Sequence, residues 1–93
     1  MNTFTVIDDN KPRQFFTDCT GCILEPRKYD QIVIYTASGH TFNVGPQMLH
    51  DLCNRLYEKI LDAAKSGKSI TVPNMEGMNE DEIRVAIDKI EVL

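Results

Sequence analysis

Residues 31–67, QIVIYTASGHTFNVGPQMLHDLCNRLYEKILDAAKSG, decide the fold. The first part, residues 31–36, is rich in β-branched and aromatic residues, which fit a pleated, half-buried surface. A turn follows at residues 37–39, because Gly39 can adopt positive φ without a steric clash. Residues 40–44 then alternate between apolar and polar side chains, as a strand with one buried face does. The sequence therefore predicts a β-hairpin at this place.

From Pro46 onward the apolar residues recur at helical spacing, and we predict a long helix over about residues 46–66. Proline suits the first helical position, because its missing N–H is not needed there. The apolar stripe of this helix comprises Leu49, Leu52, Cys53, Leu56, Ile60, Ala63 and Ala64. Tyr57 and Leu61 make the stripe wider than one sheet face needs. They indicate either a second helix packed there or a surface for a partner.

Weaker patterns on both sides of this block predict three more strands, at residues 3–7, 13–17 and 69–73. A second helix is predicted to begin after these strands, with Asn79 as its N-cap and Glu82 three residues later in a capping-box arrangement. We expect strand 69–73 to lie beside the hairpin.

Together these elements predict one small α+β domain over residues 1–93. A mainly antiparallel sheet of about four or five strands would be covered by the long helix (about 46–66) and a shorter C-terminal helix (about 80–90). A chain of 93 residues is near the small end of what folds unaided.

Composition excludes some classes of function. The chain carries ten basic and fourteen acidic residues, for a net charge of −4, and lacks the basic patch that neutralises phosphates. Direct nucleic-acid binding is therefore disfavoured. No apolar run approaches the length of about 20 residues that spans a bilayer, and the N-terminus has no secretory pattern. We expect a cytoplasmic protein without membrane association.

Four acidic residues fall within a short stretch that contains no base: Glu76, Glu80, Asp81 and Glu82. Acidic residues at the start of a helix stabilise its positive end, which gives this cluster a structural explanation. The alternative is an acidic knob that engages a basic partner protein.

Cysteine spacing suggests a metal site. Cys19 and Cys22 form a Cys-x-x-Cys pair, and His50 and Cys53 stand three residues apart on the predicted long helix. The four side chains would make a Cys3His zinc site. Against this, Cys53 lies inside the apolar stripe, where a free cysteine behaves as a small hydrophobe. The remaining explanation is a pair of partly buried thiols around a turn.

Thiol–disulfide exchange needs a cysteine at the start of a helix, but Pro26 follows Cys22 too closely for a helix there. His40 and His50 have no companion motif that would make either one a catalytic base. We predict no cofactor and no catalytic residue.

Three hypotheses of function follow. The first is a small acidic, non-enzymatic interaction protein, an adaptor or inhibitor of a larger macromolecule such as phages and mobile elements encode. Its partner-binding residues would be Tyr57, Leu61, Glu76, Glu80, Asp81 and Glu82. The second is a zinc-stabilised binding module, and the third is a small thiol enzyme or redox protein that uses Cys19. The wide helix face and the apolar residues Val92 and Leu93 could also pair two copies as a homodimer.

Overall fold

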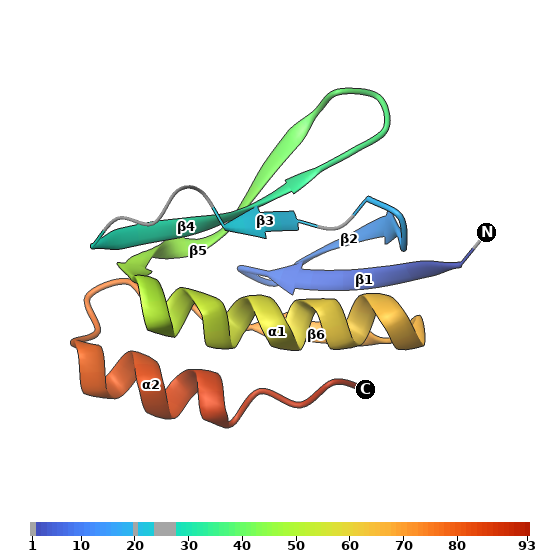
Figure 1. Cartoon of the computed structure of the whole chain (residues 1–93). Coiled ribbons are helices and arrows are strands. Elements are labelled where there is room, and N and C mark those ends of the chain that lie inside the picture. The colour runs from blue at the N-terminus through green and yellow to red at the C-terminus, as the bar shows by residue number, and fades with distance from the viewer. Residues whose placement is uncertain (1, 20, 24–27) are drawn as a thin grey trace.

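The computed structural model of the chain describes residues 2–19, 21–23 and 28–93. In these ranges six strands and two helices follow one another (Figure 1). They are β1 (Thr3–Asp8), β2 (Lys11–Phe16), β3 (Gly21–Ile23), β4 (Tyr29–Tyr35), β5 (Thr41–Leu49), α1 (His50–Ser66), β6 (Ser69–Val72) and α2 (Glu80–Asp88). The predicted α+β class is confirmed.

The strands form two three-stranded sheets instead of the single sheet that the sequence predicted. One sheet has the order β2-β1-β6 and the other has the order β3-β4-β5. All strand pairs are antiparallel except β1 and β6, which run parallel. The β4–β5 hairpin was predicted correctly, and its far end projects away from the helices in Figure 1.

The strand that follows α1 was placed wrongly. β6 pairs with β1, with Val6 opposite Ile70, and not with the hairpin. A parallel pair needs a long crossover connection, and the chain between β1 and β6 contains the second sheet and α1. A tight turn joins β1 to β2, and Asp9 and Asn10 in it both have positive φ (54° and 61°).

The start of the long helix also needs correction, since residues 46–49 belong to β5 and α1 begins at His50. Gly45 has φ +71° and lies where the β4–β5 register shifts. Its carbonyl accepts a hydrogen bond of 2.6 Å from the side chain of Gln31, and its N–H lies 3.4 Å from the Asp8 carboxylate. The strand therefore continues past Pro46, whose missing N–H is tolerated because β5 is an edge strand.

The core lies where α1 packs against both sheets. Six residues of the predicted stripe are buried: Leu52, Cys53, Leu56, Ile60, Ala63 and Ala64. Phe4 and Val6 of one sheet, and Ile32 and Ile34 of the other, belong to the same cluster. A single helix thus holds the two small sheets together. In the described chain no helix is long and apolar enough to cross a membrane.

The C-terminal helix was predicted closely. Asn79 caps α2 and accepts a hydrogen bond from the Glu82 N–H at 2.9 Å, while the Glu82 side chain accepts one from the Asn79 N–H at 3.3 Å. α2 lies alongside α1 in Figure 1 and buries Ile83 and Ile87. The capping box therefore fixes the start of α2 by local interactions alone.

α2 contacts α1 along the polar flank that contains Asp51, Arg55 and Lys59. Arg55 lies 3.2 Å from Asp88, and the Lys59 ammonium donates to the main-chain oxygens of Asp88 and Ile90 at 3.3 Å and 2.8 Å. Tyr57 and Leu61 lie on the other flank of α1. The explanation of their apolar surface by a packed second helix is therefore wrong.

Candidate functional site

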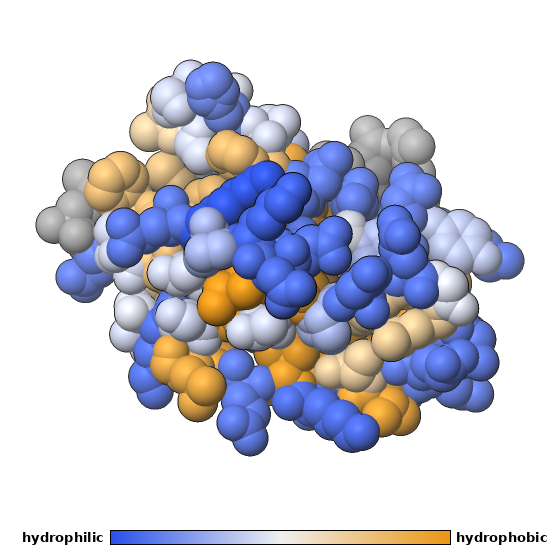
Figure 2. All heavy atoms as spheres, turned by 180° about the vertical axis from the view of Figure 1, so that it is seen from behind, coloured by the Kyte–Doolittle hydropathy of each residue, from blue (hydrophilic) through white to orange (hydrophobic). Residues whose placement is uncertain are grey.

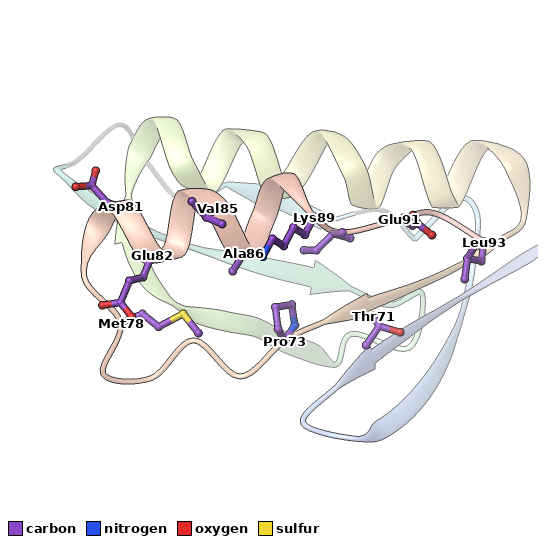
Figure 3. A pocket seen from close by; sticks show the side chains of 11 residues that line it. Thr71, Pro73, Met78, Asp81, Glu82, Val85, Ala86, Lys89, Glu91 and Leu93 are labelled. Carbon is purple, nitrogen blue, oxygen red and sulfur yellow. The ribbon is translucent and has the colours of Figure 1, made fainter.

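A groove of about 760 Å³ runs between α2 and β6. Figure 3 shows side chains from the outer face of α2 above the segment that contains Thr71 and Pro73. The apolar part of the lining consists of Pro73, Met78, Val85, Ala86, Ile90 and Leu93. The groove has the size and the apolar character of ligand-binding sites, which measure about 300–1,000 Å³.

Helical spacing explains why α2 presents an apolar surface here. Ile83 and Ile87 stand four residues apart and point into the core. Val85 lies between them in sequence, so it points away from the core and remains 52% exposed. Leu93 is 76% exposed at the other end of the groove. Viewed from behind, the lower part of the molecule carries several apolar patches with hydrophilic side chains between them (Figure 2).

Charged side chains line the rim of the groove: Asp81, Glu82, Lys89 and Glu91. Glu82 is engaged in the capping box of α2. Within the described chain, the carboxylates of Asp81 and Glu91 make no hydrogen bond or ion pair. The rim therefore offers two uncompensated negative charges and one positive charge.

One edge of the groove is the outer edge of β6. Ser69 exchanges two main-chain hydrogen bonds with Leu93, at 2.6 Å and 2.9 Å, and Ile70 forms an antiparallel bridge with Val92. The C-terminal segment thus runs antiparallel along this edge, and its register places Glu91 opposite Thr71. The side chain of Thr71 is exposed and lines the groove.

The predicted partner-binding residues fall on separate surfaces. Asp81 and Glu82 lie at the groove, whereas Glu80 is paired with Arg84 at 3.2 Å. Glu76 is exposed in the segment that precedes α2. Tyr57 packs against the core, partly buried. Leu61 lines a different hollow, of about 410 Å³, together with Asn2 and Thr17.

The structure does not bring the four predicted zinc ligands together. Cys19 lies beside a hollow of about 620 Å³ near the end of β4, with Thr36 and His40. His50 contacts Asp30 at the start of β4. Six residues of extended chain separate Asp30 from Thr36, which corresponds to about 20 Å, whereas zinc ligands lie about 2 Å from the metal. The side chain of Cys22 lies outside the described residues.

Among the described side chains, no three His, Cys, Asp or Glu residues gather in a way that could hold a metal ion. Cys19 and Cys53 are both free and buried. Within the Cys19–Cys22 motif, residue 20 and the side chain of Cys22 lie outside the described part of the chain. Among the described residues, no contact supports the zinc hypothesis, and the Cys19–Cys22 motif of the redox hypothesis lies partly outside them.

A buried polar cluster that sequence reasoning missed lies where α1 begins. Asp30 is only 2% exposed, and its Oδ2 contacts Nδ1 of His50. Its Oδ1 has no hydrogen-bond partner. Burial, and secondarily the negative charge of Asp30, raise the pKa of the Cys53 thiol to about 11. Cys53 therefore stays protonated at neutral pH, which is the opposite of what a nucleophile needs.

Sequence signals found only part of the groove. The acidic start of α2 was visible as a cluster, and Leu93 was noted as part of an apolar tail that could pair two copies, but Val85 was not singled out. Val85 breaks the helical pattern of Ile83 and Ile87, which is the one signal that could have indicated a second apolar face on α2.

Comparisons with protein-family models, with curated proteins and with solved structures find no match to this chain.

Proposed function

We propose that this protein is a non-enzymatic interaction module that binds another protein through the groove between α2 and β6. The observation that carries the proposal is the pair of exposed apolar side chains, Val85 and Leu93, at 52% and 76% exposure, in one apolar hollow. An exposed apolar surface bordered by polar residues is typical of a protein–protein contact site. Such a module acts as an adaptor or an inhibitor by occupying a surface of its partner.

Local interactions of α2 support this assignment. Its capping box and the burial of Ile83 and Ile87 form the helix without help from a partner. The apolar outer face is therefore preorganised, and binding there costs little ordering of the helix. Two of the acidic residues that the sequence assigned to a partner surface, Asp81 and Glu82, line the same groove.

The experiment compares two substitutions at equally exposed apolar positions. Val85→Asp introduces a charge into the groove, whereas Phe16→Asp introduces one on β2, where Phe16 is 50% exposed. The wild type and both variants are used as bait in cells, cross-linked, and the recovered proteins are quantified. Urea unfolding first verifies that both variants fold.

We expect a defined partner to be recovered with the wild type and with Phe16→Asp, and to be lost with Val85→Asp. Equal recovery with Val85→Asp would remove the groove from the function. Recovery of no partner by folded wild-type bait would contradict the interaction module itself.

A further inference from the structure

We infer that two copies of this chain associate through the outer face of α2, with the two helices antiparallel and related by a two-fold axis beside Val85. The inference goes beyond the proposed function, because it names what covers this face when the partner is absent. Self-association does not require a partner, so the two assignments are tested separately. The evidence is a row of three exposed side chains whose charges complement the same row in reverse order.

The row consists of Asp81, Val85 and Lys89, all of which line the groove and are exposed. They stand four residues apart and therefore lie on one face of the helix. Lys89 follows the last residue of α2 but keeps the right-handed helical conformation, with φ −83° and ψ −10°. Figure 3 shows the three side chains one after another along α2. Ile83 and Ile87 point from the opposite side of the helix into the core, so the fold leaves this row uncovered.

The two charges in the row are not compensated by the described part of the chain. Neither the Asp81 carboxylate nor the Lys89 ammonium makes a hydrogen bond or an ion pair there. By contrast, Arg84 on the same helix pairs with Glu80 at 3.2 Å. Asp81 and Lys89 are eight residues apart, about 12 Å along the axis, which is too far for them to pair with each other. Each therefore needs an opposite charge from another molecule.

The spacing of the row makes it complementary to a second copy of itself. Helical rise places Asp81 about 6 Å before Val85 and Lys89 about 6 Å after it. When a second α2 runs antiparallel with its Val85 beside the first, Asp81 of each copy meets Lys89 of the other. A two-fold interface requires this kind of self-complementarity. Parallel helices would instead put Asp81 beside Asp81 and Lys89 beside Lys89, so the charges select the antiparallel arrangement.

Helix packing allows the two rows to lie alongside each other. Side chains four residues apart form the ridges that pack together in the commonest class of helix contact. The interface is small, because α2 has nine residues and is about 13 Å long. Small interfaces are typical of weak complexes, and the net charge of −4 on each chain adds repulsion. We therefore expect a dissociation constant of about 10 µM to 1 mM, which leaves the face accessible to a partner.

Sedimentation equilibrium of the purified full-length protein tests the dimer, at concentrations from about 10 µM to about 1 mM and under reducing conditions. We expect a reversible monomer–dimer equilibrium for the wild type. Val85→Asp should be monomeric, because it brings two carboxylates together at the axis. Phe16→Asp, at an equally exposed apolar position on β2, should dimerise like the wild type. Urea unfolding verifies that both variants fold.

Three results would overturn the inference. They are a wild type that stays monomeric at the highest concentration, a dimer that survives Val85→Asp, and a dimer that is lost equally in Phe16→Asp.

Charge reversal tests the antiparallel pairing. Asp81→Lys and Lys89→Asp each convert both ion pairs into like-charge contacts, so each variant alone should dimerise about tenfold or more weakly than the wild type. An equimolar mixture of the two variants restores complementarity, because one chain then carries two lysines in the row and the other carries two aspartates. We expect mixed dimers with an affinity close to that of the wild type. A mixture that associates no better than its separate components would contradict the pairing of Asp81 with Lys89.

The outcomes separate this inference from the proposed function. If the wild type is monomeric but the cellular partner is still lost with Val85→Asp, the proposed function stands and the dimer is excluded. If the mixed dimer forms but folded wild-type bait recovers no protein other than itself, the dimer stands and the proposed function fails.

Discussion

The two helices use their apolar residues in different ways. α1 directs six buried side chains into a core that it shares with both sheets. α2 buries only Ile83 and Ile87, leaves Val85 half exposed, and contributes Ala86 to the wall of a groove. The core accounts for these six residues of α1, but it does not account for the outer face of α2. The exposed outer face of α2 is the observation on which our proposal of a partner site rests.

The contact between the helices shows the same contrast. Arg55 and Lys59 of α1 reach α2 through polar groups at 2.8–3.3 Å, and these groups lie at the surface. Exposed ion pairs contribute little to stability. Removing apolar atoms from α1 should therefore lower the free energy of unfolding, whereas removing them from the outer face of α2 should change it little.

The largest expected effect is that of Leu56→Ala in α1. Leu56 has no exposed surface, so the substitution leaves a cavity in the core and should cost about 2–5 kcal/mol of unfolding free energy. Val85→Ala on α2 is the matched comparison and should change stability by about 0.5 kcal/mol or less. Urea unfolding at neutral pH measures both. Equal losses would mean that α2 is as much a part of the core as α1, and the contrast between the helices would be wrong.

Much of this contrast could be predicted from sequence. The helical period of α1 and the capping box at Asn79 are local patterns, and both were predicted correctly. The first turn of α1 was not, because Gly45 and Pro46 equally suit a helix start and an edge strand. Contacts from Gln31 and Asp8, distant in sequence, settle that choice.

Long-range pairing explains the other failures. The parallel pairing of β6 with β1 joins segments more than sixty residues apart, and no local pattern encodes it. The groove exists only because this pairing places Thr71 and Pro73 below α2. Likewise, no sequence pattern singled out Asp30, which the fold places beside His50 and near Cys53.

The second-largest expected effect is a dependence of the free energy of unfolding on pH, which comes from Cys53 in α1. Burial raises the pKa of the Cys53 thiol from 9.0 to about 11. The unfolded chain therefore loses this proton at lower pH than the folded protein does. The stabilising contribution is complete below pH 9 and is lost as the pH rises to about 11, a fall of about 2–3 kcal/mol.

Urea unfolding of the wild type and of Cys53→Ala between pH 7 and 11 measures this contribution. The difference between the two proteins isolates the thiol from the lysines and tyrosines that titrate in the same range. We expect the alanine variant to lose less stability than the wild type across this range. Parallel curves would show that Cys53 ionises freely, and the core at the start of α1 would then be open to water.

The smallest effect tests the junction between the helices. α2 has no basic residue in its last turn, and Lys59 of α1 supplies the cation at that end by donating to the oxygens of Asp88 and Ile90. A cation near the C-terminus of a helix contributes about 0.3–1 kcal/mol, so Lys59→Met should reduce stability by about that amount. Hydrogen exchange should rise in α2 and not in α1. Lys68→Met, at an exposed site outside both helices, is the control. If exchange in α1 rises equally, the two helices open together, and α2 cannot be a preorganised wall that is attached to an independent core.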